Sequence, residues 1–438
     1  MNLPLPPELT PNRAGVPDLP AFWHAVALCT PFDGGPVTVA EVWLDSVAGA
    51  MRVLQCRLDG AYLDLLFTGT EAWLLDSVDG GVPRAIIGPF PSDCRAPRAD
   101  WFSRQGLRSP GSGPLLGVAC DWWVGLTTCR NPANPDNPPA PVDQVANWFW
   151  FRSGSGLPLQ MMFINQDNDY KLPVLGDFAK VTFTESVAVI DANADAGLGA
   201  MLARVAGTAG AASGTPVLAA PAGAAIATPA ERARLCSSQP GLAARLLPGL
   251  RMPTPTDSLP VWAERLYLTS FSIATYDVAP NAPYPTQVYY DAGLSHMLTR
   301  LQLQDGSTED CILDAGTTHI VRRWPDGTHK NVAQLPVGLP YRDWPARDDA
   351  TIVAAIDRHP LFCPDGTLLL MSAPSTLGRV FWIWYTGAGV PVSFLEAPQC
   401  GNVQLVLTEY AAMVTGGEPF DPALFVVPTD LQGAAYGT

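Results

Sequence analysis

Two stretches of this chain, residues 42–60 and 288–306, are degenerate copies of one pattern, and this duplication constrains the fold more than any other feature. A shift of 246 positions (288 − 42) aligns them without a gap. The identical pairs include Val42 with Val288, Asp45 with Asp291, Met51 with Met297, Asp59 with Asp305 and Gly60 with Gly306. A further match pairs residues 148–151 with 381–384. The chain is therefore predicted to be a tandem of two domain-sized repeats, which excludes short-period solenoids and propellers.

Each repeat has the pattern of antiparallel β-structure. Short alternating, β-branched and aromatic runs are separated by Gly, Asp and Pro turns, which is typical of hairpins rather than of βαβ units. The strands expected in the first repeat are 22–30, 38–45, 51–58, 62–68, 71–76, 117–128, 147–151, 157–164 and 180–190. Those expected in the second are 267–276, 286–291, 296–304, 311–314, 319–324, 332–335, 367–371, 379–385, 391–395 and 403–415. Helices are expected in the repeats only near 99–105 and 348–356.

The composition changes along the chain and divides it into four segments. Residues 1–18 are Pro-rich and are expected to form an extended arm, followed by the first β repeat over 19–190. Residues 191–258 are rich in Ala, Gly and Pro and are expected to be a linker with one or two short helices. Residues 259–438 hold the second β repeat and a C-terminal tail.

The charge balance excludes several classes of partner. The formal net charge is −15, with 26 basic against 41 acidic side chains, so phosphate-rich nucleic acid and anionic bilayers would be repelled. The first 20 residues lack a charged region followed by an apolar run, and no 18-residue apolar stretch is present. We therefore expect no nucleic-acid partner, no membrane partner and a cytoplasmic location.

The His and Cys residues give no metal-binding pattern. The five His lie far apart in the sequence, at 24, 296, 319, 329 and 359, and the nine Cys form no C-x-x-C pair. Without such spacings, neither a zinc site nor a redox motif is predicted. We expect a protein that uses no metal.

Aromatic strands are the strongest sign of a binding site. Adjacent aromatic residues place rings on both faces of a strand, because side chains alternate. The opposite face then packs against a second layer, or it lines a cavity for a hydrophobic ligand. The residues considered for substrate binding are Trp43, Trp150, Tyr289, Trp382 and Trp384. Asp45 and Asp291, each two residues after an aromatic residue, are either turn formers or catalytic carboxylates.

Several short motifs resemble the indole-shifting enzymes of violacein biosynthesis (VioE-like). The resemblance is carried by the entry Leu259-Pro260 with Tyr267-Leu-Thr269, the strand Val42–Arg52, and the run Ser155–Met161 followed by Asp177-Phe178. That family is similar in fold to bacterial lipoprotein carriers (LolA-like), whose curved antiparallel sheet is an open half-barrel around an apolar cavity. The resemblance implies two tandem curved antiparallel sheets, equivalent to the family's homodimer fused into one chain, and no cofactor.

The resemblance also implies site residues, with departures. The family's tyrosine and hydroxyl on the first strand correspond to Tyr267 and Thr269, but to Ala27 and Cys29 in the first repeat. A family glutamate corresponds to Glu71, with Thr318 in the other copy. The family's arginine before Asp-Phe is replaced by Gly176. The candidate catalytic residues are therefore Tyr267, Thr269, Asp291, Asp45 and Glu71.

These features lead to two hypotheses of function. The first is a cofactor-independent biosynthetic enzyme of specialised metabolism that cyclises or rearranges an apolar aromatic, indole-like intermediate, with upstream pathway enzymes as partners. Such catalysis needs a dry cavity and a few positioned polar groups. The second is a non-catalytic carrier or chaperone for a hydrophobic ligand, which needs the cavity and no titratable pair.

Overall fold

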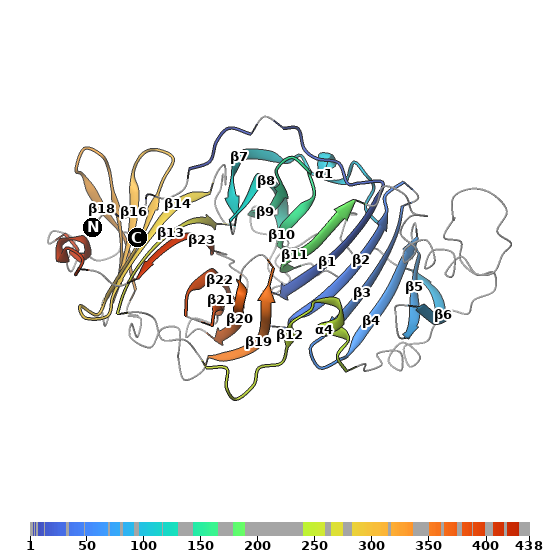
Figure 1. The fold of residues 1–438 in the computed structure, drawn as a ribbon. Helices are drawn as coiled ribbons and strands as arrows, with labels where there is room; N and C mark the ends of the chain where they lie inside the picture. Colours follow the sequence, from blue (N-terminus) through green and yellow to red (C-terminus); the bar gives the residue numbers. More distant parts are fainter. Residues whose placement is uncertain are drawn as a thin grey trace, which may run out of the picture. The chain divides into compact units, whose positions relative to one another are not determined.

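The fold is described from a computed structural model, which divides into two compact units that are described separately (Figure 1). One contains residues 12–109 and 120–252, called the first-repeat unit here, and the other contains 1–11, 110–119 and 253–438, called the second-repeat unit. The described residues are 3, 5, 8–12, 14–31, 35–47, 49–68, 71–78, 82–91, 96–115, 117–129, 143–164, 178–188, 240–258, 264–274, 283–313, 317–335, 350–360, 363–374, 379–387, 389–398, 406–415 and 418–428.

The first repeat forms an antiparallel sheet in the order β6-β5-β4-β3-β2-β1-β11-β10-β9-β8. Its strands are β1 (Phe22–Pro31), β2 (Thr38–Asp45), β3 (Ala50–Arg57), β4 (Tyr62–Thr68), β5 (Glu71–Val78), β6 (Val82–Pro91), β8 (Val118–Cys129), β9 (Asp143–Arg152), β10 (Pro158–Ile164) and β11 (Phe178–Ala188). The same part of the chain contains β7 (Arg108–Leu115) and the short helix α1 (Trp101–Arg104). The first and last strands of the repeat pair with each other, so they lie in the middle of the sheet.

The second repeat forms a sheet with the corresponding order, β19-β20-β21-β22-β23-β13-β14-β15-β16-β17-β18. Its strands are β13 (Arg265–Ala274), β14 (Tyr284–Asp291), β15 (His296–Gln302), β16 (Thr308–Leu313), β17 (Thr318–Arg323), β18 (His329–Leu335), β19 (Thr351–His359), β20 (Cys363–Pro374), β21 (Arg379–Thr386), β22 (Pro391–Pro398) and β23 (Val406–Thr415). The remaining elements are α4 (Leu242–Leu246), β12 (Leu250–Arg251) and the 3-10 helix η1 (Pro422–Phe425). The prediction of a mainly β chain with two tandem antiparallel sheets is confirmed.

The strand pairing places Asp45 and Asp291 at equivalent positions. Asp45 ends β2 opposite Ala50 of β3, and Asp291 ends β14 opposite His296 of β15. Because 291 − 45 and 296 − 50 are both 246, the register reproduces the shift that aligned the two sequences. A slip of one residue would have turned every core side chain to the other face.

The register corrects the expected correspondence of the first strands. Tyr267 lies opposite Tyr289, and the equivalent of Tyr289 is Trp43, which lies opposite His24. Tyr267 therefore corresponds to His24, not to Ala27, and Thr269 by the same count to Val26, not to Cys29. The β-bulges agree, since they fall after Val26 in β1 and after Thr269 in β13. The error arose because the short Leu-Pro match was extended across a change in loop length.

The structural equivalence of the aromatic strands β9 and β21 also differs by one residue from the sequence alignment of 148–151 with 381–384. Trp150 lies opposite Gln160 just before a register shift in β10, and Trp384 lies opposite Ser393 just before one in β22. Trp150 thus corresponds to Trp384, and Trp148 to Trp382 rather than to residue 381. The hairpin that follows is one residue shorter in the second repeat, which shifted the sequence match.

The helix predicted at 348–356 is wrong, because β19 covers Thr351–His359 and pairs with β20. The run Thr-Ile-Val supplies three β-branched residues, and these fit a pleated sheet better than a helix. The helix expected at 99–105 is present as α1. Of the linker expected over 191–258, the structure describes residues 240–258, which include the short helix α4, and the rest lies outside the described residues.

The main core of the first-repeat unit lies on one face of its sheet. Alternate residues of the strands, such as Val42, Leu44, Met51 and Val53, are fully buried there. Helix α1 packs on the same face through Trp101 and Phe102, which contact Phe149 edge to face. In the described part of the chain, no helix is long and apolar enough to cross a membrane.

Candidate functional site

The second sheet has two differently covered faces. One carries the main apolar core of this repeat, including Leu266, Leu268 and Val288. The opposite face, called the tyrosine face here, carries a separate cluster whose sheet members are Tyr267, Tyr289, Leu298, Ile312 and Val321. Positions two apart on a strand share a face, so this face also carries Thr269, Gln287, Asp291, Arg300, Asp310 and Arg323.

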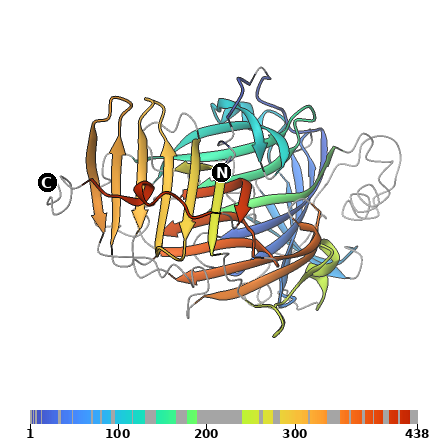
Figure 2. The ribbon, with the colours of Figure 1, turned by 60° about the vertical axis from the view of Figure 1, so that its left-hand side comes forward.

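A segment near the C-terminus covers the tyrosine face. Residues 420–428, called the C-terminal strap here, include η1 and run across β13 to β18, as the red segment does in Figure 2. Phe420 packs edge to face on Tyr289 with 5.5 Å between ring centroids, and Phe425 lies 5.5 Å from the His296 ring. Leu3, Leu424 and Val427 are packed against the same cluster. The strap therefore buries the apolar middle of this face.

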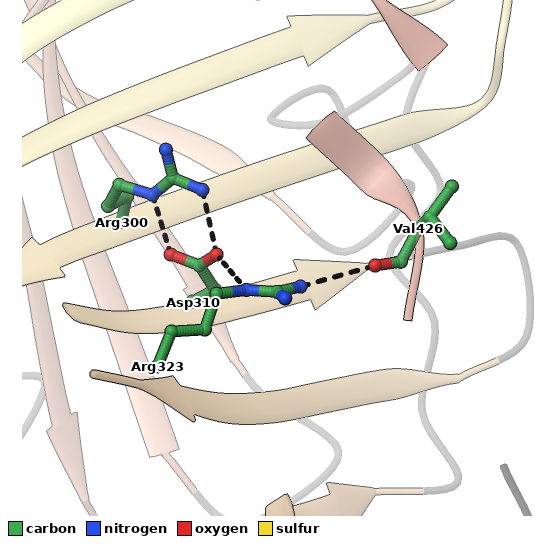
Figure 3. Close-up of polar contacts among 4 residues, drawn as sticks. All are labelled: Arg300, Asp310, Arg323 and Val426. Carbon is green, nitrogen blue, oxygen red and sulfur yellow. Dashed lines mark hydrogen bonds and ion pairs between the residues drawn. The ribbon is translucent and has the colours of Figure 1, made fainter. Parts of the chain in front are cut away.

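Two arginines share one buried carboxylate beside the strap (Figure 3). Arg300 donates from Nε and Nη2 to the two oxygens of Asp310, at 2.7 and 2.8 Å. Arg323 donates from Nε to the same carboxylate at 2.9 Å and from Nη2 to the Val426 carbonyl at 3.2 Å. The Asp310 side chain is fully buried, whereas the Arg300 and Arg323 side chains are 26% and 31% exposed. Hydrogen bonding to Asp310 raises the pKa of Arg300, so this guanidinium stays charged.

A pocket opens between this arginine pair and the strap. Its volume is about 520 Å³, within the range typical of small-molecule sites. It is lined by Arg300, Arg323, Asp421, Ala423, Leu424, Val426 and Pro428. Val426 is 53% exposed, which is unusual for a large apolar side chain. The pocket therefore combines guanidinium groups on the sheet side with aliphatic groups on the strap side.

Tyr267, one of the predicted site residues, lies under the strap and is hydrogen-bonded to Gln287. Gln287 Nε2 donates to its hydroxyl at 2.9 Å, and its ring centroid is 4.9 Å from that of Tyr289. Burial is the main cause that raises the pKa of Tyr289 to about 12. Both tyrosines are almost completely buried. Tyr289 is therefore neutral at physiological pH and contributes no negative charge to this face.

The other predicted residues of the second repeat are buried as well. Asp291 accepts the Leu294 amide at 3.1 Å and pairs with Arg265 Nε at 3.2 Å, which is the pattern of a turn-forming carboxylate. Thr269 is 1% exposed, and its hydroxyl has no hydrogen-bond partner among the described residues. The register places Thr269 opposite Gln287, two residues along β13 from Tyr267.

The equivalent face of the first repeat is built differently. Asp64 corresponds to Asp310, but its partner is Arg52, which donates to both of its oxygens at 2.8 and 2.5 Å. Both side chains are buried, and the Arg52 guanidinium lies over the Trp43 ring at 5.1 Å. His24 and Glu41, the equivalents of Tyr267 and Gln287, form a 2.9 Å pair. Asp45 accepts the Val47 amide at 3.0 Å and so also forms a turn.

A helix covers this face where the strap covers the other. Helix α4 packs against β2 and β3. Its Arg245 acts electrostatically on Cys56, whose thiol pKa is raised to about 12 chiefly by burial. The Arg52 side chain is 1% exposed, whereas Arg300 and Arg323 on the equivalent position of the other repeat are 26% and 31% exposed.

The predicted tryptophans lie in packed interior clusters. Trp150 stacks on Trp148 with 6.1 Å between centroids and meets Trp122 edge to face at 5.4 Å. Trp382 and Trp384 are also buried. The indole N–H groups of Trp148, Trp150 and Trp382 have no hydrogen-bond partner among the described residues. Glu71 begins β5 opposite Thr68 and belongs to the first-repeat unit, so it is not a residue of the tyrosine face.

The residues that line the pocket escaped the sequence analysis. Asp310 and Asp64 are aligned by the same shift of 246, and each lies on the same side of its strand as an apolar residue two positions away. An acidic residue at a core position in both copies was a usable signal, because a buried charge needs a partner. Nothing in the sequence pointed to residues 420–428, because a strap that crosses strands has no periodic pattern.

Comparisons with known proteins identify no family. No protein-family model and no curated protein sequence matches the chain. Among solved structures, a LolA-superfamily protein from Nitrosomonas europaea is 11% identical, with a TM-score of 0.24 over 39% of this chain and 94% of that one. MucB in complex with MucA(peri) is 13% identical, with a TM-score of 0.22 over 89% and 88%. An uncharacterised conserved protein from Thermus thermophilus is 15% identical, with a TM-score of 0.23 over 39% and 80%.

No group of three or more His, Cys, Asp or Glu within the described ranges is arranged to hold a metal ion. The polar groups of the pocket are guanidiniums and one rim carboxylate. Guanidinium groups donate hydrogen bonds and do not bind metal cations. The chemistry offered by the pocket is therefore recognition through hydrogen-bond donors and apolar contact.

Proposed function

We propose that the protein binds a small, largely apolar molecule in the pocket beside the C-terminal strap, and that it acts as a carrier. The observation that supports this most directly is the 520 Å³ pocket lined by the aliphatic side chains of Ala423, Leu424, Val426 and Pro428. Concave sites with mostly apolar walls and a few polar groups are the usual form of small-molecule sites. A ligand that covered Val426 would bury an apolar side chain that is now 53% exposed.

The positions of the carboxylates favour a carrier over an enzyme. Asp310 accepts three N–H groups from two arginines, and Asp291 accepts one amide and one guanidinium. The oxygens of both carboxylates are therefore occupied by donors of the protein itself and are not directed at a ligand. A carrier needs no proton transfer and is compatible with this arrangement.

A cofactor-independent cyclase or isomerase for an aromatic intermediate is the second candidate. One observation favours it: the buried Thr269 hydroxyl has no partner among the described residues and shares a face with Tyr267. An unpartnered buried hydroxyl is costly and often has a function. This candidate requires the strap to move, since both side chains are 1% exposed.

Ligand extraction and a pocket variant test the carrier proposal. Mass spectrometry of the organic extract from gently purified protein should find an apolar compound at close to one equivalent. Val426→Asp should reduce that occupancy at least tenfold, because it places a charge against the apolar wall. Val332→Asp is the matched control, since Val332 is 48% exposed and lies outside the pocket lining. Equal occupancy in both variants would refute the site, and a ligand recovered chemically altered after incubation would favour the enzyme.

A further inference from the structure

We propose that the ligand of this pocket carries a single negative charge, a carboxylate, which Arg300 and Arg323 bind together. This inference rests on the proposed function and specifies the class of ligand. It follows from the balance of charge at the arginine pair, from the guanidinium groups left without partners, and from the apolar wall on the other side of the pocket.

The arginine pair has one more charge than its carboxylate can balance. Two guanidiniums share Asp310, and the neighbouring phenol of Tyr289 is neutral. Asp291, on the same face, is paired with Arg265 instead. Asp421 at the rim is exposed, and its carboxylate accepts the Ala423 amide, so solvent screens its charge. One positive charge therefore remains partly buried, where an anion would be favourable.

The arginines also have donors to spare. Figure 3 shows that Arg300 and Arg323 each use Nε and one terminal nitrogen. That nitrogen is Nη2 in both, so Nη1 of each guanidinium has no partner among the described residues. Both residues line the pocket. Guanidinium groups bind carboxylates strongly because their N–H groups match the spacing of the oxygens.

Asp310 acts as a positioning residue for these donors. Its carboxylate accepts hydrogen bonds from both guanidiniums, and the Val426 carbonyl of the strap accepts one from Arg323. The side chains are thus fixed before a ligand arrives, which lowers the entropic cost of binding. The single net charge of the cluster, two guanidiniums less one carboxylate, selects a monoanion over a phosphate dianion.

Three ligands with one alkyl chain test this assignment: decanoic acid, 1-decanol and decyl phosphate, titrated by calorimetry at pH 7.5. We expect the acid to bind about tenfold or more tightly than the alcohol, the usual effect of a hydrogen bond to a charged group. Arg300→Gln and Arg323→Gln should each remove that preference, so that the acid binds no more tightly than the alcohol. Arg322→Gln is the matched control, because Arg322 lies next to Arg323 but pairs with Asp305.

The outcomes separate the two proposals. If none of the three ligands binds, the carrier site itself is wrong. If the acid and the alcohol bind equally, the pocket exists but the carboxylate assignment fails, and tighter binding of decyl phosphate overturns the choice of a monoanion. Should the arginine variants fold poorly, the wild-type protein suffices: raising salt from 50 to 500 mM must weaken the acid and not the alcohol. Equal salt dependence would contradict the inference.

Discussion

Asp64 and Asp310 occupy the same position in their two sheets, 246 residues apart (310 − 64), yet only Asp64 has a fully buried arginine partner. Asp64 lies opposite Leu54 and pairs with Arg52, whereas Asp310 lies directly opposite Arg300. In the first repeat, the aspartate and its arginine are thus both buried inside the protein. In the second repeat, the aspartate is buried but its arginines reach a pocket.

This difference predicts unequal costs of removing the two carboxylates. Asp64→Asn removes the charge that pairs with the buried Arg52 guanidinium, so the free energy of unfolding should fall by about 3–5 kcal/mol. Asp310→Asn should cost less, about 1–2 kcal/mol, because its arginines are partly solvated. Guanidinium denaturation curves measure both. Asp59→Asn, which breaks an exposed pair with Arg57, is the control and should change almost nothing. Equal losses at Asp64 and Asp310 would contradict the different burial.

The turn-forming carboxylates predict a loss of stability without a loss of binding. Asp291→Ala removes the hydrogen bond to the Leu294 amide and the ion pair with Arg265. We expect the free energy of unfolding to fall by about 1–3 kcal/mol. Affinity for a pocket ligand should stay within about twofold at a temperature where the variant is folded. A folded variant that had lost binding or turnover would instead support the catalytic reading of Asp291.

The pair of Tyr267 and Gln287 predicts a measurable coupling. Tyr267→Phe removes the acceptor of the 2.9 Å bond and leaves the ring packing on Tyr289 intact. The expected cost is about 1 kcal/mol of unfolding free energy. Combining it with Gln287→Leu should cost less than the sum of the two single changes, since the double variant leaves no buried amide unsatisfied. Strictly additive costs would show that the two groups do not interact.

The buried histidine of β19 predicts acid lability. His359 is fully buried, and desolvation lowers its pKa from 6.5 to about 4. Between these values the unfolded chain binds the proton and the folded protein does not, so stability falls as pH drops from 6.5 towards 4. The loss attributable to this residue is at most about 3 kcal/mol. Denaturation of wild type and His359→Gln at pH 7 and pH 4.5 measures it: the variant should lose less stability, and an identical loss would refute the assignment.

The sequence predicted the repeats, the strand class and the equivalence of Asp45 and Asp291, because alternation and an ungapped match are local signals. The sequence alignment failed where loops differ in length between the two repeats. The loop between β1 and β2 differs in length from the loop between β13 and β14. The correspondence of Tyr267 with His24 can therefore be read only from the hydrogen-bonded register of these strands. The helix expected near 348–356 failed because Ala354 and Ala355 favour a helix locally, whereas pairing with β20 requires a strand.

The pocket could not be predicted because it is assembled from distant parts of the chain. Arg300 and Arg323 lie on different strands, and Val426 comes from a segment more than a hundred residues beyond Arg323. Tyr289 was identified from its aromatic character and Tyr267 from the resemblance to the VioE-like enzymes, but the strap that buries them has no counterpart of the same kind among the described residues of the first repeat. A site formed by register and by a crossing segment leaves no motif in the sequence.

The pairing of the first and last strands of each repeat has a consequence for synthesis. Strand β1 begins 156 residues (178 − 22) before β11, its neighbour in the middle of the sheet. At 5–20 residues per second, the ribosome leaves that inner edge of β1 exposed for on the order of ten seconds. An unpaired edge is a template for misassembly with another chain. Nascent copies crowded on one polysome are therefore the state in which this protein is most exposed to aggregation, and a chaperone that holds the β1 edge would act there.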